Sequence, residues 1–395
     1  MEKLKICLIS KYPPHKGGTA GLNYWFARTL GELGNEVHVV TDSIESGNYF
    51  KNLNEERMKG YEPKNVRVHE LKSDSPLPSK SRTSLLVNLA MKVMEENDID
   101  LIDTKYFVPY GVAGFFAKLI TGKPLVTRHS GSDITYLLKD PSYRTLLINM
   151  LKNSDKIILD PSKLDEIKGL GVEEKRIACC SDFGMNMKTI PKEKTKSFLK
   201  MMGIDSELPI IGCFGKIFEG KGLLELLHAL SKIKNENFSL LLVPETNKDG
   251  IKSYLSKFGL EEKSIILDYQ PPWVMPFLYD SLTALIATEV DFPVKMHTPL
   301  TAYEAFYLGK CTVISEETHR KPPFKDLEDG VNAIIVDPKD TDNYAKRLKW
   351  IVKNPQGTEE IGRNVKNSHK CPDGKMITEK LVEIYREVVE NGKSE

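Results

Sequence analysis

Short apolar runs alternate with amphipathic stretches along the first half of the chain. The runs are rich in β-branched residues and end at turn-forming residues, as buried strands do; they lie at residues 4–10, 36–41, 66–71, 100–103, 124–127, 156–159 and 176–181. Helical spacing of apolar residues marks 20–33, 84–96 and 112–120. Strands that alternate with helices predict a parallel sheet with crossover helices, which is a doubly wound domain.

The same alternation begins again in the second half of the chain. Strand-like runs lie at 208–214, 239–243, 264–267, 284–287, 312–315 and 333–336, and helical patterns at 223–233, 340–352, 358–368 and 375–389. Residues 184–196 carry Pro191 and several lysines but no strand-like run, so we place an interdomain linker there. The predicted fold class is α/β, with two facing doubly wound Rossmann-like domains and a ligand site in the cleft between them.

Composition limits the classes of protein that fit this pattern. A chain of 395 residues is too long for one ordinary core, and 40% hydrophobic with 28% charged residues is typical of a soluble globular protein. A formal net charge of +1 does not favour nucleic-acid binding. The six cysteines form no C-x-x-C pair, and four lie in strand-like runs, which favours reduced thiols and a cytoplasmic location. No run approaches the roughly 18 apolar residues of a membrane span, so any membrane contact would be peripheral.

Candidate chemistry is concentrated in residues 215–222, which read GKIFEGKG between a strand-like run and a helical pattern. Glycines let the backbone approach an anion, the helix N-terminus points N–H groups at it, and Lys216 and Lys221 can neutralise phosphoryl oxygens. The spacing approaches a nucleotide-triphosphate loop, but Gly222 stands where a hydroxyl must hold magnesium. The alternative is a glycine-tolerant turn with solvated lysines.

A second glycine turn, at Gly17 and Gly18, follows the first predicted strand. A dinucleotide fingerprint is one interpretation, because Gly21 follows and Asp42 ends the next strand, although Lys16 occupies the place of the first glycine. An ordinary glycine turn is the plainer alternative.

A third candidate site is the start of the helical stretch after residue 297. We expect Thr298 to be the N-cap and Pro299 the first helical residue. The free amides there could bind a phosphoryl oxygen, and Thr301 and Glu304 lie three apart on one face. An acidic residue near a helix start can also serve only to stabilise the helix dipole.

Taken in order, these motifs resemble the retaining nucleotide-sugar glycosyltransferases of family 4, the glycosyl transferases group 1, over nearly the whole chain. The turn YPPHKGG at 12–18 looks like the family's P-x-x-G-G loop, and 215–222 is similar to its G-R-x4-K-G motif with Lys in place of Arg. PLTAYEAFYLGK at 299–310, followed by CTVI, looks like its glutamate helix and next strand, and DGVNAIIV at 329–336 is similar to "dGvnGllv".

This resemblance implies the two-domain GT-B fold, with residues 1–190 as the acceptor-binding domain and 191–374 as the nucleotide-sugar domain. The last helix, 375–395, would return to the first domain. It also implies roles for residues around the donor: phosphate contacts by Lys216 and Lys221 and ribose contacts by Glu304. The remaining donor-binding residues would be Gly17, Gly18, Gly215, Thr298, Pro299, Leu300 and Thr301.

The loop under the reacting sugar is implied by RHSGSD at 128–133, which resembles the family's H-G-x-D. Aligning Gly131 and Asp133 puts Ser130 at the family's histidine, so His129 lies one place early. The family's first glutamate is replaced by Met296, which cannot accept hydrogen bonds from sugar hydroxyls as a carboxylate would. His297 beside it is a candidate sugar contact, or simply a loop residue.

The expected activity is transfer of a sugar from a nucleoside-diphosphate sugar to an acceptor hydroxyl, with retention of anomeric configuration and without metal or cofactor. His129, Lys216, Lys221 and Glu304 are the expected catalytic residues. The acceptor is left open among saccharides, lipid-linked molecules and small molecules. Two alternatives remain: a catalytically silent nucleotide-sugar or glycan-binding protein, motivated by Met296 and the shifted His129, and a GT-B epimerase or phosphorylase.

Overall fold

The chain forms two α/β units. The computed structural model describes residues 3–44, 58, 60–71, 82–130, 132–181, 184–205, 207–217, 219–245, 248–293 and 297–392. Contacts group residues 1–15, 19–186 and 372–395 into the first unit, and 16–18 and 187–371 into the second. The sequence placed these boundaries at 190 and 374.

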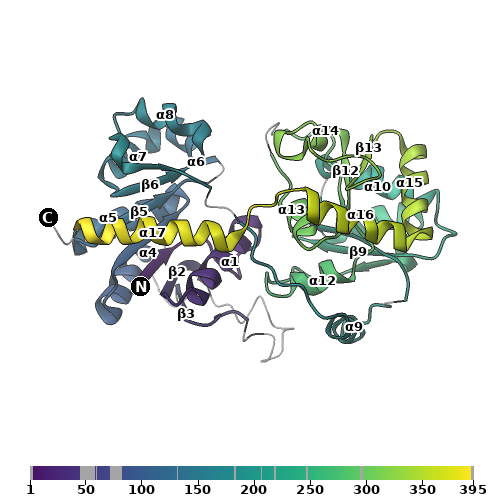
Figure 1. Ribbon diagram of the computed structural model, residues 1–395, viewed down its shortest axis with the longest axis horizontal. Helices are drawn as coiled ribbons and strands as arrows, with labels where there is room; N and C mark the ends of the chain where they lie inside the picture. The colour runs from purple at the N-terminus through teal and green to yellow at the C-terminus, as the bar shows by residue number, and fades with distance from the viewer. Residues whose placement is uncertain are drawn as a thin grey trace. The chain divides into compact units, whose positions relative to one another are not determined.

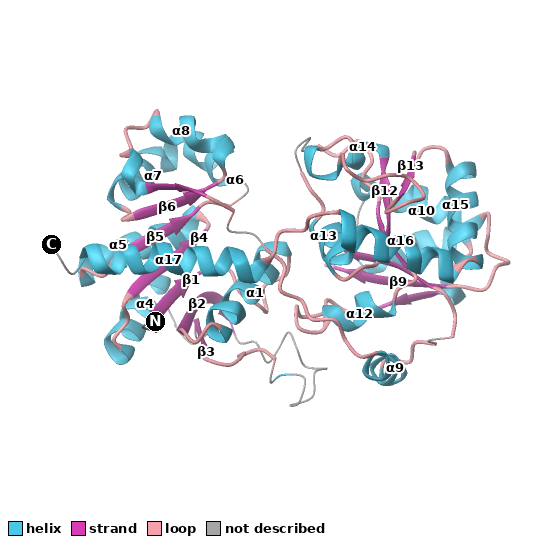
Figure 2. Cartoon of the chain, in the orientation of Figure 1, coloured by secondary structure: helices cyan, strands magenta, loops and turns pink. Residues whose placement is uncertain are grey.

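In the described part of the first unit, a seven-stranded parallel sheet has the order β3-β2-β1-β4-β5-β6-β7. Strands β2, β3, β5 and β6 of this sheet are labelled in Figures 1 and 2. Its strands are β1 (Lys5–Ile9), β2 (Glu36–Ile44), β3 (Val66–Leu71), β4 (Leu101–Lys105), β5 (Leu125–Arg128), β6 (Lys156–Leu159) and β7 (Ile177–Cys179). The α-helices are α1 (Gly18–Glu32), α4 (Arg82–Asn97), α5 (Val112–Thr121), α6 (Ser132–Thr135), α7 (Pro141–Asn153), α8 (Leu164–Lys168) and α17 (Gly374–Gly392).

The two faces of this sheet follow from the alternation of side chains along each strand. On one face, Cys7, Ile9 and Ile102 join a core with the apolar stripes of α4, α5 and α7. On the other, Asp103 accepts hydrogen bonds from Arg128 Nε (2.8 Å) and from Tyr385 of α17 (2.7 Å). The closing helix therefore belongs to the first unit, and its buried Tyr385 donates a hydrogen bond to the carboxylate of the buried Asp103–Arg128 pair.

The second unit repeats the arrangement, with six described strands in the order β10-β9-β8-β11-β12-β13, all parallel. The strands are β8 (Ile210–Gly215), β9 (Ser239–Pro244), β10 (Ser264–Ile266), β11 (Ala284–Ala287), β12 (Cys311–Ser315) and β13 (Ile334–Val336). The α-helices are α9 (Lys192–Met201), α10 (Leu223–Ser231), α11 (Lys248–Phe258), α12 (Met275–Ser281), α13 (Leu300–Tyr307), α14 (Glu316–His319), α15 (Thr341–Lys353) and α16 (Pro355–Ser368).

The strand order reverses between β8 and β11, which are neighbours in the sheet. From β8 the chain continues outward to β9 and β10, and from β11 it continues in the opposite direction to β12 and β13. Open α/β sheets bind ligands at the carboxyl ends of the strands beside such a reversal. The loops that follow Gly215 and Ala287 start at this point, and both are rich in polar residues. The fold therefore predicts that a ligand of the second unit binds at these two loops.

The expected linker differs from the structure in one respect. Residues 184–196 were predicted to be a linker without a strand, and no helix was assigned there, but α9 begins at Lys192. Thr195 donates a hydrogen bond to Asp280 of α12 (2.7 Å), and the Phe198 ring lies 5.0 Å from that of Phe277. The helix is stabilised by packing on a distant segment of the chain, which the local pattern does not reveal.

The expectation of buried thiols in the strand-like runs is confirmed only in part, because Cys179 in β7 is exposed and Cys180 is half-buried. Cys7, Cys213 and Cys311 are buried within β1, β8 and β12, and all six cysteines are free. Burial raises the pKa of each of these three thiols to about 12, so they stay protonated and unreactive at neutral pH. Among the residues that the structure describes, no helix is both long and apolar enough to cross a bilayer.

Candidate active site

The glycine-rich loop after β8 lies against the beginning of α13. Gly215 ends the strand with φ +91°, a conformation that favours glycine. A Cβ placed on it would lie 3.7 Å from Cγ2 of Thr301. Two segments that the sequence assigned to donor binding, 86 positions apart, are thus neighbours in the second unit.

The end of this loop fits tightly against the loop after β11. Gly222 has φ +72°, and a Cβ there would lie 2.3 Å from the carbonyl oxygen of Thr288, which is closer than atoms can approach. The Val290 N–H also donates to the Gly220 carbonyl (3.2 Å). These backbone contacts bring Lys221 beside Glu289. Lys216, at the other end of the loop, is exposed.

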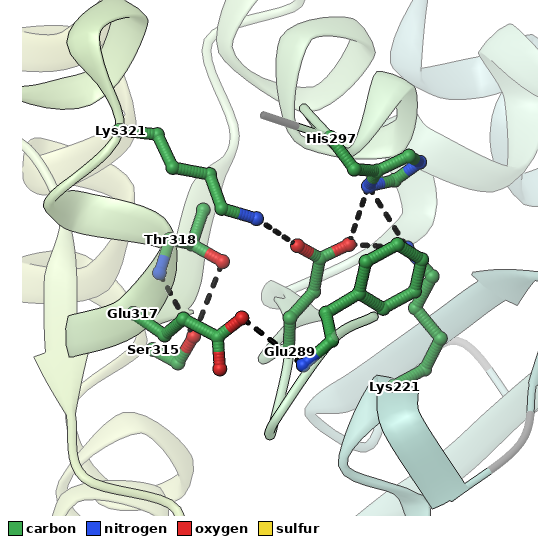
Figure 3. Close-up of polar contacts among 8 residues, drawn as sticks. Lys221, Glu289, His297, Ser315, Glu317, Thr318 and Lys321 are labelled. Carbon is green, nitrogen blue, oxygen red and sulfur yellow. Dashed lines mark hydrogen bonds and ion pairs between the residues drawn. The ribbon is translucent and has the colours of Figure 1, made fainter. Parts of the chain in front are cut away.

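Glu289 is the centre of a polar cluster, which we define as Lys221, Glu289, His297 and Lys321 (Figure 3). Its side chain is 1% exposed. One carboxylate oxygen pairs with Lys221 and lies 2.7 Å from Nδ1 of His297, and the other pairs with Lys321. Figure 3 shows Lys321 approaching from one side and Lys221 and His297 from the other.

Burial and charged neighbours shift the pKa values of Glu289 and Lys221. Burial alone would raise the pKa of Glu289, but hydrogen bonds from His297 and the charged groups of Lys221 and Lys321 hold it at about 2. Burial lowers the pKa of Lys221, and Glu289 opposes that shift by favouring the ammonium form. The carboxylate is therefore ionised at neutral pH, and the two lysines exceed it by one positive charge.

An aromatic side chain covers the cluster. The ring of Phe292 lies 4.3 Å from Nζ of Lys221 and 5.7 Å from Nζ of Lys321, and its centroid is 4.5 Å from that of His297. A ring face near an ammonium group is attractive and displaces water. The backbone N–H of Phe292 donates to Glu317 (3.2 Å), which anchors the loop that carries it.

Lys321 reaches the cluster from the short segment after β12. Ser315 caps α14 by accepting the Thr318 N–H (3.2 Å), and the Thr318 carbonyl accepts the Lys321 N–H (3.1 Å). The Lys321 side chain is 5% exposed. Sequence reasoning missed this lysine, and it also missed Glu289 and Phe292. Glu289 carried one usable signal, because an acidic residue lies two positions after the end of a strand at the reversal point.

The start of α13 corrects the predicted cap. The helix begins at Leu300, and its N-cap is Pro299 in an extended conformation (φ −68°, ψ 113°). The expectation that Thr298 caps the helix is wrong, because Thr298 lies one residue before the N-cap, and Pro299 at the N-cap makes no side-chain hydrogen bond to the helix. Proline has no side-chain acceptor, so the first N–H groups of the helix are left without a side-chain cap. A helix end of this kind favours an anion.

Glu304 lies on the α13 face that it shares with Thr301. Its carboxyl group accepts a hydrogen bond from the hydroxyl of buried Tyr279 (2.5 Å), whose ring packs against Phe214 of β8. Burial raises the pKa of Glu304 to about 7, and the bond from Tyr279 opposes the shift only in part. Near neutral pH this carboxyl group is partly protonated and can both donate and accept hydrogen bonds.

His129 and Asp133 of the predicted sugar loop lie in the described part of the first unit. His129 is partly buried after β5, and its backbone N–H donates to the Ile158 carbonyl (3.1 Å). Asp133 is fully buried and accepts the Ser130 N–H (2.9 Å), so its carboxylate shapes the loop. Gly131 and Met296 lie outside the described residues. Gly17 has φ +103° and Gly18 opens α1.

The dinucleotide alternative required a free acidic side chain at Asp42 for a ribose. Asp42 is buried instead. One of its carboxylate oxygens lies 2.7 Å from Nε2 of His15 and also accepts a hydrogen bond from the Tyr110 hydroxyl (2.6 Å). Arg82 lies 3.2 Å from the other oxygen. These contacts occupy the groups that a ribose would need, which argues against dinucleotide binding at this turn.

The described residues contain no group of three His, Cys, Asp or Glu side chains with the geometry of a metal site. The positive charge at the candidate site is supplied by lysine side chains and by the uncapped end of α13. This set of groups suits an anionic ligand.

Comparisons with known proteins match the two units separately. The family described as glycosyl transferases group 1 matches residues 195–368, within the second unit, and the family described as glycosyl transferase 4-like matches residues 50–161, within the first. A relative, the N-acetyl-alpha-D-glucosaminyl L-malate synthase of Bacillus anthracis, is 26% identical over 247 residues. That match covers 61% of this chain and 61% of the relative, so the aligned part is less than two thirds of its length.

Solved structures are similar along the whole chain. Sucrose-phosphate synthase of Thermosynechococcus elongatus is 16% identical with a TM-score of 0.65, covering 98% of this chain and 99% of that one. Anabaena HepE in complex with UDP-glucose is 17% identical with a TM-score of 0.65, covering 97% and 100%. At these identities the likeness shows the fold, which is the predicted pair of Rossmann-like domains of the GT-B class.

Proposed function

We propose, from the premise that this chain belongs to the glycosyl transferases of group 1, that it transfers a sugar from a nucleoside-diphosphate sugar to an acceptor hydroxyl with retention of configuration. The observation that carries the proposal is the convergence of Lys221, the glycine loop and the uncapped start of α13 at the reversal point of the second sheet. Anabaena HepE, which shares the fold, was solved in complex with UDP-glucose, and this supports a donor of the same class.

The donor diphosphate is the group that these features would stabilise. Negative charge develops on its terminal oxygen as the bond to the sugar breaks. Lys221 and the N–H groups at the start of α13 meet that charge within the second unit, and exposed Lys216 at the other end of the loop adds a second cation. Cations and amides supplied by the protein can do this without a metal ion, which is the mechanism we propose.

Recognition of the nucleoside is assigned to Glu304. The Tyr279 hydroxyl holds one of its oxygens, which fixes the carboxyl group beside the glycine loop. A carboxyl group with a pKa of about 7 can take either role in hydrogen bonds to two adjacent ribose hydroxyls. Gly17, Gly18 and Gly215 are proposed as close backbone approaches to the same donor, with Thr298, Pro299, Leu300 and Thr301 around its phosphates.

Retention is proposed to follow from attack on the face that the phosphate leaves. The carbon–oxygen bond to the diphosphate breaks, a bond to the acceptor oxygen forms, and the acceptor proton passes to the departing phosphate oxygen. The protein's role is then positioning and charge stabilisation. His129, Gly131 and His297 are proposed as contacts of the transferred sugar, and buried Asp133 is proposed to shape the loop that carries His129 and Gly131.

A second candidate, a silent nucleotide-sugar-binding protein, is motivated by Met296 at the place of a glutamate. An incubation with a panel of nucleotide sugars separates the two. An enzyme produces free nucleoside diphosphate slowly even without acceptor, whereas a binding protein shows thermal stabilisation alone. Retention of product configuration by NMR, and activity in excess chelator, test the finer parts of the proposal. A pyridoxal phosphorylase would show the cofactor's absorbance.

The place of action is proposed to be the cytoplasm. All six cysteines are free, and three of them are buried in strands, which is typical of proteins that fold under reducing conditions. Labelling of accessible thiols in cell fractions tests this proposal.

A further inference from the structure

The polar cluster contains a lysine that the proposed mechanism does not use. Lys321 and Lys221 both pair with the carboxylate of Glu289, one on each oxygen. Their exposures differ: the Lys221 side chain is 18% exposed and that of Lys321 is 5%. Lys221 can therefore meet a ligand, whereas Lys321 is enclosed behind the carboxylate.

The pairing of Lys221 with Glu289 has one favourable and one unfavourable effect on the binding of a phosphate group. An ammonium group has three N–H donors, and the pairing uses one of them, which fixes the direction of the others. A nearby carboxylate, however, repels the same phosphate that the ammonium attracts. A lone pair of Lys221 and Glu289 would be neutral and would offer the donor little net attraction.

We propose that Lys321 is a positioning residue that neutralises Glu289, so that Glu289 can hold Lys221 in place while Lys221 keeps its full attraction for the donor diphosphate. This inference rests on the proposed function and assigns a role within the same site. The row of Lys221, Glu289 and Lys321 then carries a net positive charge, and Lys221, at its outer end, is held in a fixed position.

Local geometry supports a charge role for Lys321 beyond simple packing. Its ammonium group lies 5.7 Å from the Phe292 ring and is bonded to the Glu289 oxygen that Lys221 and His297 do not use. The segment that carries it is fixed by the cap of α14, so the ammonium group is held in place before any ligand arrives. Removing the charge from this position should change the field at Lys221 with little change in its position.

The test compares Lys321→Met, Glu289→Gln and the double variant by calorimetric binding of UDP, ADP and GDP, with the matching nucleosides beside them. Lys321→Met should weaken binding of the preferred nucleoside diphosphate about tenfold, since an unneutralised carboxylate then faces the phosphates. Binding of the uncharged nucleoside should change less than twofold. The double variant, which removes both charges, should return to within about threefold of the wild type.

Lys325→Met is the matched control, because Lys325 is an exposed lysine four positions further along the same segment. It should bind all ligands as the wild type does. If Lys321→Met weakens nucleoside and nucleoside diphosphate equally, or if the double variant does not recover, Lys321 has only a structural role and the inference is wrong. If the wild type binds none of the three diphosphates, the proposed function itself fails and the inference falls with it.

Discussion

Two carboxyl groups near the reversal point of the second sheet have pKa values shifted in opposite directions. Burial raises the pKa of Glu304 to about 7, because only the Tyr279 hydroxyl opposes the loss of solvent. The Glu289 side chain is also enclosed, yet hydrogen bonds and charges from His297, Lys221 and Lys321 hold its pKa at about 2. Partners, more than burial, thus decide which group is ionised, and the two carboxyl groups are fitted to different tasks.

Replacing Lys221 by Ala should reduce the turnover rate by about two orders of magnitude or more, because a charged contact to the leaving diphosphate is lost. Lys216→Ala should have an effect of the same order. Turnover with saturating donor is the measurement, with circular dichroism to check the fold. Lys234→Ala, at an exposed lysine of the same unit, is the control. A turnover rate near the wild-type value in either variant would contradict the proposed contact between that lysine and the leaving diphosphate.

The raised pKa of Glu304 predicts how stability depends on pH. The folded protein binds this proton more tightly than the unfolded chain, whose value is 4.5. The contribution is therefore fully present below pH 4.5 and is lost as the pH rises to about 7, with a total of the order of 3 kcal/mol.

Urea unfolding of the wild type and Glu304→Gln across this range measures that contribution. The free energy of unfolding of the wild type, relative to the variant, should fall between pH 4.5 and 7 and level off above. Glu262→Gln, at an exposed position, controls for the loss of one carboxylate. A difference between wild type and Glu304→Gln that stays constant with pH would contradict the assigned environment of Glu304.

At the scale of elements, most strands and helices could be predicted because their signals are local. Parallel strands buried on both faces read as continuous apolar runs, and helices carry a stripe at 3.6-residue spacing. The start of α13 was misplaced by one residue because Pro299 suits both the first helical position and the N-cap. Helix α9 was missed because its stability depends on contacts with α12.

The same distinction explains which residues of the candidate site could be predicted from the sequence. Lys216, Lys221 and the glycines lie in one continuous motif, whereas Glu289 and Lys321 meet Lys221 only in the folded chain. Lys321 is 100 positions from Lys221 and lies in a loop without motif or periodicity. No local pattern could have indicated their pairing.

Gly222 tests how tightly the glycine loop is held to the loop after β11. Gly222→Ala should destabilise the protein by more than about 2 kcal/mol, because a left-handed conformation and a clash with the Thr288 carbonyl act together. Gly203→Ala is the matched control: it has φ +70° but nothing within 4 Å of the added Cβ. It should cost only the conformational term of about 1–2 kcal/mol. Equal unfolding midpoints for the two variants in urea would show that the contact with Thr288 is unimportant.

At the scale of the whole molecule, the chain builds two doubly wound units from one repeated plan and then returns to the first. Helix α17 joins the first unit through Tyr385, whose hydroxyl meets the buried pair of Asp103 and Arg128. The family matches fall on both units, and the described donor-site features lie in the second. The central claim is that these features bind a nucleoside-diphosphate sugar and release its sugar to an acceptor.

The most direct test of that claim is the release of nucleoside diphosphate from a panel of UDP-, ADP- and GDP-sugars, measured in excess chelator with wild-type protein and Lys221→Ala. We predict release from at least one donor by the wild type, unaffected by chelator and reduced about a hundredfold or more in the variant. Absence of release from every donor, despite thermal stabilisation by one of them, would contradict the claim and favour a binding protein. Release that chelator abolishes and magnesium restores would contradict the metal-free mechanism.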